Sequence, residues 1–132
     1  MIEDELDRLL SDVARYGGIC FPAKLKVYAP TCNNTCVQAV EKLYRRLTEL
    51  FGGATVYKGA IGTFVDPERG VVEEEPVWVI EAAHNCLTPA EARSFAKALT
   101  EYASEAKQNY IAVSQGSFYV LPSEAMARRF KT

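Results

Sequence analysis

The sequence predicts one α+β domain. Its 132 residues match the size of a typical single domain, about 100 to 150 residues. Segments with apolar residues at helical spacing follow segments in which polar and apolar residues alternate, so both helices and strands are expected. A hydrophobic share of 48% and a charged share of 24% are ordinary for a soluble globular protein. This composition excludes a disordered or collagen-like chain.

The first two elements expected are a helix and a strand. Residues 2–16 place leucines and a valine at helical spacing between acidic residues, and Gly17 with Gly18 provides a left-handed end. Residues 24–29 alternate lysines with Leu, Val and Ala, which is typical of a half-buried strand that ends at Pro30.

A second helix is expected to begin near Thr35, because Thr35 followed by Gln38 fits a capping box. An apolar stripe continues to Phe51, and two glycines follow it. This start would place Cys36 at the first helical position.

Residues 54–65 and 71–82 are expected to form a long hairpin, because Asp66-Pro-Glu-Arg-Gly70 between them is a turn sequence. The hairpin also contains residues that disturb regular strands. Two glycines indicate β-bulges in the first strand, and a proline indicates a break or an edge position in the second: Gly59, Gly62 and Pro76.

The third helix has the clearest start in the chain, with Thr88 as the cap, Pro89 at the first position and Glu91 at the third. It is expected to continue to about Lys107. Two short strands and a last short helix should follow, at residues 109–114, 117–121 and 123–132.

Without the terminal helices, the predicted order is β-α-β-β-α-β, which is the ferredoxin-like arrangement with both helices on one face of the sheet. A fifth strand extends the last one as a hairpin. The prediction is therefore a single domain over residues 1–132: an amphipathic helix within 1–18, the ferredoxin-like core at 24–121 and a short helix at 123–132.

The four cysteines and the one histidine are expected to divide between two opposite edges of this sheet. Cys32 and Cys36 follow the first strand, whereas Cys20, His84 and Cys86 belong to the other edge. Zinc needs all its ligands within about 2.3 Å of one point, so a single zinc site is disfavoured and no metal or other cofactor is expected. The alternatives are inert thiols or two disulfides, Cys20 with Cys86 and Cys32 with Cys36.

The acidic N-terminus lacks a signal-peptide core, and no segment reaches the roughly 18 to 20 apolar residues of a membrane span. A cytoplasmic location without membrane contact is therefore expected. The formal charge of −2 argues against bulk attraction to nucleic acid.

Two catalytic hypotheses involve the cysteine thiols. Cys36 at a helix N-terminus would gain thiolate character, with Cys32 as its resolving partner, but a structural disulfide is the preferred interpretation. His84 and Cys86 are two residues apart and could form a base and a nucleophile, although a lone histidine at a strand end is more often structural.

Three residues of the first strand are the candidate binding residues: Lys24, Lys26 and Tyr28. Basic and aromatic side chains on an open sheet face suit single-stranded RNA, but no RNA-recognition signature is present. Coverage of this face by a second subunit is the preferred interpretation. The acids Glu73, Glu74 and Glu75 are expected to be solvated. Glu81 could serve as a general acid or base only if it is half-buried in a cleft.

Part of the chain resembles a small uncharacterised α+β family found in bacteria, archaea and their viruses. The similarity is carried by residues 50–81, where Phe51-Gly-Gly-Ala-Thr-Val56 matches a helix end written Phe-x-Gly-x-Thr-Val, and by Lys107-Gln-Asn-Tyr-Ile-Ala-Val113. It covers roughly residues 24–121, whereas the cysteines, His84 and the terminal helices depart from the pattern. The resemblance supports the fold and implies no activity.

The sequence thus predicts a non-enzymatic binding or assembly module that acts as a homodimer over its sheet face or edge. Two alternatives stay open. One is a small enzyme or thiol switch that uses Cys36 or the His84/Cys86 pair, and the other is a nucleic-acid-binding accessory protein.

Overall fold

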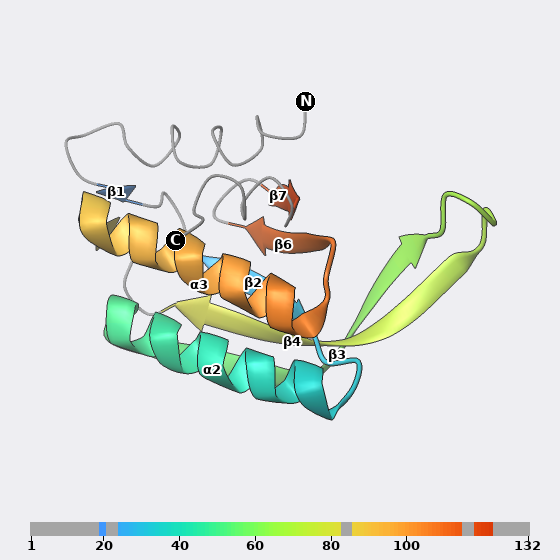
Figure 1. The fold of residues 1–132 in the computed structure, drawn as a ribbon, viewed down its shortest axis with the longest axis horizontal. Helices are drawn as coiled ribbons and strands as arrows, with labels where there is room; N and C mark the ends of the chain where they lie inside the picture. Colours follow the sequence, from blue (N-terminus) through green and yellow to red (C-terminus); the bar gives the residue numbers. More distant parts are fainter. Residues whose placement is uncertain (1–18, 21–23, 83–85, 115–117, 123–132) are drawn as a thin grey trace.

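The computed structural model of this chain describes four segments: residues 19–20, 24–82, 86–114 and 118–122. The helices expected at 2–16 and 123–132 lie outside the described residues, and so does His84. Figure 1 shows the described elements in colour.

The main sheet has five strands in the order β3-β4-β2-β6-β7, and every neighbouring pair is antiparallel. Its strands are β2 (Lys26–Pro30), β3 (Ala54–Val65), β4 (Val72–Ala82), β6 (Tyr110–Ser114) and β7 (Phe118–Pro122). This α+β architecture is compatible with the predicted ferredoxin-like fold. A further two-stranded ladder, β1 (Ile19–Cys20) with β5 (Cys86–Leu87), was not expected from the sequence.

Two antiparallel helices, α2 (Asn34–Phe51) and α3 (Pro89–Ala106), cover one face of the sheet (Figure 1). We call this the near face and the opposite one the far face. The core lies between the helices and the near face, where apolar side chains of both layers are fully buried: Val27, Val40, Leu47, Leu99, Ile111 and Val113. Removing these side chains from water is the main force that holds the two layers together.

The caps of the two helices differ in how well the sequence predicted them. Thr88 caps α3 in a complete capping box with Glu91, as expected. The expected cap of α2 at Thr35 was wrong, because Asn33 accepts a hydrogen bond from the backbone N–H of Cys36 at 2.9 Å. Cys36 is therefore the third helical residue instead of the first.

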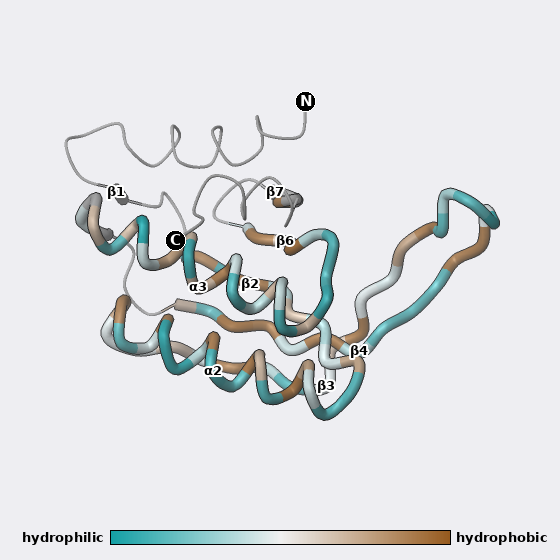
Figure 2. The backbone as a smooth tube through the Cα atoms, viewed as in Figure 1, coloured by the Kyte–Doolittle hydropathy of each residue, from teal (hydrophilic) through white to brown (hydrophobic). Residues whose placement is uncertain are grey.

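The long hairpin is confirmed, with β3 over residues 54–65 and β4 over 72–82. Its register shifts between Tyr57 and Ala60, where two residues of β3 lie opposite Trp78, so the bulge expected at Gly59 is present. Gly59 adopts a φ of +85°, which favours glycine. Beyond the bulge the hairpin curves away from the body as a projecting arm, residues 60–76 (Figures 1 and 2).

The other two predictions for the hairpin had mixed outcomes. Gly62 pairs regularly with Glu75, so the second expected bulge was wrong. β4 continues through Pro76, which lies one residue beyond the last β2–β4 pair, at Pro30 and Val77. The carbonyl of Pro76 accepts a hydrogen bond from the N–H of Thr31 at 2.9 Å. Because the nitrogen and the carbonyl of one strand residue point to the same side, the nitrogen of Pro76 points away from β3. The missing N–H therefore costs no hydrogen bond to β3.

Gly62 instead allows close packing, which leads to a first prediction. A Cβ atom at this position would lie 2.9 Å from a methyl carbon of Val77, a buried side chain on β4. Gly62→Ala should therefore lower the free energy of unfolding by roughly 1 kcal/mol, measured by urea denaturation. In a Val77→Ala background the same change should cost much less, and an equal cost in both backgrounds would show that this contact is not the cause.

Candidate functional site

The far face of the sheet carries a cavity of about 600 Å³ between the arm and the turn that leads from α3 into β6. Its floor is the far face of β2 and β4, with Tyr28, Val77 and Val79. The arm forms one wall and the turn the other. The lining side chains and backbone come from four separate parts of the chain: Tyr28, Pro30, residues 60–64, Glu75, Val77, Val79, residues 107–110 and Ala112.

Local backbone structure brings the α3–β6 turn to this place. α3 ends at Lys107, whose φ of 55° and ψ of 43° are left-handed. The N–H of Gln108 then donates to the carbonyl of Ala103 at 2.9 Å, which satisfies an end-of-helix carbonyl and turns the chain sharply. Residues 107–109 consequently reach the cavity before Tyr110 begins β6.

Glu75 is the acidic side chain of the cavity, and Lys107 is the basic one, among the described residues that line it. Glu75 is half-buried, and desolvation by this burial raises its pKa above the ordinary 4.5. Within the described part of the chain no ion pair to Glu75 is present. A carboxylate in such surroundings is stabilised by a cation that enters the cavity.

Aromatic side chains line the same cavity as this carboxylate. Tyr28 is half-buried on the floor, and its hydroxyl forms a hydrogen bond with the hydroxyl of Ser114 at 3.2 Å. Phe64 on the arm is 45% exposed, and Tyr110 on β6 is 57% exposed. Aromatic faces bind both flat apolar groups and cations, so the cavity suits a ligand that carries both.

Tyr102 on α3 interacts electrostatically with Glu75. Its hydroxyl is buried and donates to the carbonyl of Pro30 at 2.8 Å, which fixes α3 to the end of β2. Burial, with a smaller contribution from the negative charge of Glu75, raises the pKa of Tyr102. The hydroxyl therefore remains a hydrogen-bond donor at any physiological pH.

The three predicted binding residues share the far face but have different surroundings. Tyr28 lines the cavity, whereas the ammonium groups of Lys24 and Lys26 lie 3.5 and 3.8 Å from the carboxylate of Glu81. Glu81 thus offsets one of the two positive charges, and one remains on this exposed part of the face. Contact of these lysines with RNA stays a prediction.

The predicted pairing of Cys32 with Cys36 is present as a disulfide, with Cα atoms 5.8 Å apart. The Cys36 side chain is only 2% exposed, and its sulfur lies 3.6 Å from the carbonyl oxygen of Ala106. The side-chain amide of Gln108 lies 3.8 Å from the Cys32 sulfur. The disulfide at the start of α2 therefore packs against the turn that forms one wall of the cavity.

The other predicted pair lies at the opposite end of the sheet. Cys20 on β1 is the register partner of Cys86 on β5. In the chain, β5 comes after the end of β4, which is the end of the sheet at which Lys26 pairs with Glu81. A disulfide between Cys20 and Cys86 stays a prediction. No cluster of three or more potential metal ligands occurs among residues that the structure describes.

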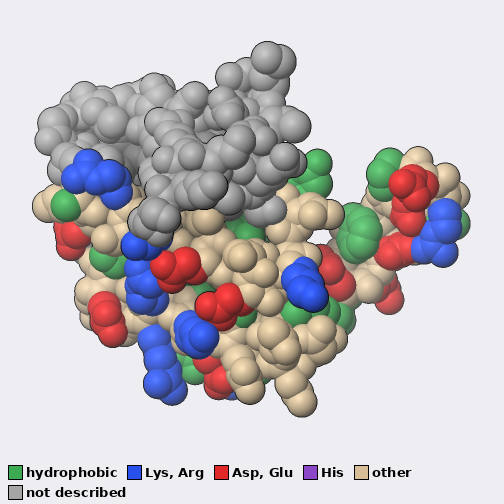
Figure 3. Space-filling view, in the orientation of Figure 1, with side chains coloured by type: hydrophobic (Ala, Val, Ile, Leu, Met, Phe, Trp, Pro, Cys, Tyr) green, Lys and Arg blue, Asp and Glu red, His purple; other side chains and the backbone are tan. Residues whose placement is uncertain are grey.

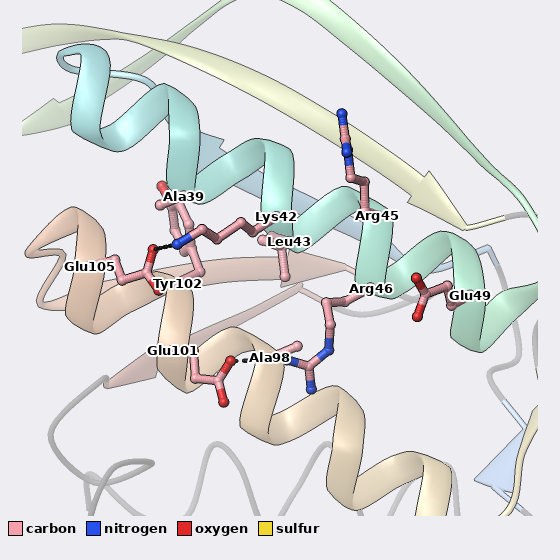
Figure 4. A pocket seen from close by; sticks show the side chains of 10 residues that line it. All are labelled: Ala39, Lys42, Leu43, Arg45, Arg46, Glu49, Ala98, Glu101, Tyr102 and Glu105. Carbon is pink, nitrogen blue, oxygen red and sulfur yellow. Dashed lines mark hydrogen bonds and ion pairs between the residues drawn. The ribbon is translucent and has the colours of Figure 1, made fainter.

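A second, smaller hollow of about 270 Å³ lies on the outer surface between α2 and α3. Figure 4 shows Lys42 and Arg46 extending from α2 toward Glu105 and Glu101 on α3, at 3.3 and 2.9 Å. These four charged groups compensate one another across the hollow. We interpret these two ion pairs as contacts that hold the two helices together.

Comparison with known proteins gives similarity at the level of the fold. No family model and no curated protein match the chain. A phage SAM lyase, solved in complex with S-methyl-5'-thioadenosine, is similar over 76% of this chain and 89% of its own, with 14% identity and a TM-score of 0.53. A Bacillus cereus protein related to NIF3 is similar over 74% of this chain and 25% of its own, with 20% identity and a TM-score of 0.45.

The sequence analysis missed Glu75 as a site residue, although a signal for it exists. Residues at alternating positions of a strand share a face, so Glu75 shares one with Val77 and Val79. A carboxylate that continues an apolar strand face differs from one in a solvated acidic run. The walls that bury Glu75, however, come from distant segments.

No described helix is both long enough and apolar enough to cross a membrane.

Proposed function

We propose that the chain is a non-enzymatic binding module that acts as a homodimer and holds a small organic cation in the far-face cavity. The main support for this proposal is the half-buried carboxylate of Glu75, which has no ion-pair partner among the described residues. It lies in a cavity lined by apolar and aromatic side chains. The fold we assign to this module is a ferredoxin-like unit, β2-α2-β3-β4-α3-β6, extended by β7. Its cytoplasmic location stays a prediction.

Size and chemistry both support a small-molecule ligand. The cavity volume of about 600 Å³ lies within the range of roughly 300 to 1,000 Å³ typical of small-molecule sites. Glu75 would neutralise the cation, and Tyr28, Phe64 and Tyr110 would contact its apolar or aromatic part. Lys107 at the wall offers a counter-charge for an acidic group on the same ligand.

The similar phage protein suggests suitable probes. That protein was solved with S-methyl-5'-thioadenosine, and its fold is similar to that of this chain. SAM has the same adenosine body but adds a sulfonium cation and an amino-acid chain, both of which S-methyl-5'-thioadenosine lacks. The two compounds therefore test the cation and this chain together, and the pH dependence of the preference isolates the contribution of the charge on Glu75.

We expect SAM to bind about tenfold more tightly than S-methyl-5'-thioadenosine at pH 7.5, measured by isothermal titration calorimetry. The preference should shrink as the pH falls toward the pKa of Glu75, which burial raises above 4.5, because protonation of Glu75 removes the charge that selects the cation. Equal affinities at pH 7.5, or no binding of either compound at millimolar concentration, would contradict the proposal.

The same samples test the non-enzymatic part of the proposal. SAM incubated with the protein should be recovered intact, when measured by mass spectrometry against a buffer blank that corrects for its spontaneous breakdown. Consumption above that blank would favour the alternative of a small enzyme.

A further inference from the structure

We propose that the near face of the arm binds a second copy of this chain through a two-fold symmetric contact. This inference deepens the proposed homodimer and does not depend on the ligand site, which lies on the other face of the sheet.

The arm extends the sheet past the two helices that cover its near face elsewhere. In the space-filling view it stands clear of the body and carries apolar side chains as well as charged groups of both signs (Figure 3). A two-stranded ribbon is marginal in water unless something packs against it. The near face of the arm therefore has a physical reason to be covered.

The cross-strand register places a row of side chains on this near face. Val65 pairs with Val72 and Ile61 pairs with Pro76, and both pairs share the face on which Trp78 packs against the core. Ile61 is 60% exposed, Val65 62% and Val72 70%. A row of large exposed apolar groups on one face marks a protein contact.

The order of charges along the arm fits a second copy that lies in the opposite direction. At the tip, Arg69 pairs with both Asp66 and Glu73, which leaves a net negative charge there. On the near face, Lys58 lies at the base, with its ammonium group 4.4 Å from the centre of the Trp78 ring, and Glu74 lies toward the tip. When two arms stack in antiparallel fashion, each base meets the other tip, and Lys58 of each copy faces Glu74 of the other.

Light scattering after size-exclusion chromatography at 10 to 100 µM (roughly the range in which weak dimers form) tests the contact. The protein should have twice the 14.6-kDa mass of the chain. Val72→Lys should reduce this to one chain mass, because it places a charge in the apolar row. Val71→Lys is the matched control, since Val71 is an exposed valine of the tip outside the strands, and it should remain dimeric.

A monomeric parent protein would overturn the inference, and so would a Val72→Lys variant that stays dimeric. A trimer would contradict the two-fold arrangement.

A charge exchange tests the pairing of base and tip. Lys58→Glu and Glu74→Lys should each weaken the dimer, and the double variant should restore it. Failure of the double variant to recover would contradict the antiparallel contact, provided that circular dichroism shows each variant folded.

SAM titration of Val72→Lys separates this inference from the ligand proposal. Unchanged affinity in a monomeric variant supports two independent surfaces. Dimerisation without any SAM binding would support the arm contact while contradicting the cavity.

Discussion

Glu75→Gln is expected to lower the affinity for SAM by tenfold or more and, at the same time, to make the free protein more stable at neutral pH. A carboxylate that is moved out of water without a partner destabilises the fold in its charged form. The amide has nearly the same shape and no charge, so it removes both that cost and the attraction for a cation. Function and stability should therefore change in opposite directions.

The pH dependence gives this prediction a definite sign. Because burial raises the pKa of Glu75 above 4.5, the folded state binds more protons than the unfolded state between 4.5 and the raised pKa. The contribution of Glu75 to stability therefore becomes less favourable as pH rises through that window, and Glu75→Gln should gain most above it. The two proteins should converge below pH 4.

Urea denaturation between pH 3.5 and 7.5 measures the stability difference, and calorimetry measures the affinity. Glu68→Gln is the control, because Glu68 is an exposed acid at the tip, outside the cavity. It should change neither quantity. A Glu75→Gln variant that is less stable at pH 7.5, or that retains full SAM affinity, would rule out the role assigned to this carboxylate.

Loss of the Cys32–Cys36 disulfide should lower the free energy of unfolding by about 2 kcal/mol, as expected for a cross-link that closes so short a loop. Cys32→Ala is the suitable change because the Cys32 side chain is exposed, whereas truncation of the buried Cys36 would also remove core packing. Denaturation without reductant provides the measurement.

The control for this prediction is the same comparison in a reducing buffer. Both proteins then lack every disulfide, including any bond between Cys20 and Cys86, so their difference should disappear. A loss of similar size in both buffers would show that Cys32 acts through something other than the cross-link.

The parts of the fold that the sequence predicted well have strong local signals. The cap of α3 at Thr88 and the hairpin turn at 66–70 each depend on a few adjacent residues, and both agree with the structure. The start of α2 was misplaced because Asn33 and Thr35 are both good cap residues, and asparagine is the better of the two. The ladder of β1 with β5 has only two residues in each strand, too few for a periodic pattern.

The candidate site was less predictable, because its geometry depends on contacts between distant segments. Tyr28 was correctly placed on the far face by strand alternation alone. The ion pairs of Lys24 and Lys26 need the register that brings Glu81 beside them. The burial of Glu75 needs the arm on one side and residues 107–109 on the other, and no local pattern encodes that meeting.

The left-handed backbone of Gly59 has an evolutionary consequence if the arm joins two copies. The extra residue in β3 sets the direction in which the arm leaves the body, whereas the apolar row that makes the contact lies farther out. Insertion or deletion at this point would re-aim the whole contact without altering its chemistry. Descendants of this chain can therefore change from a closed pair to a ring or a filament through one small change in backbone geometry.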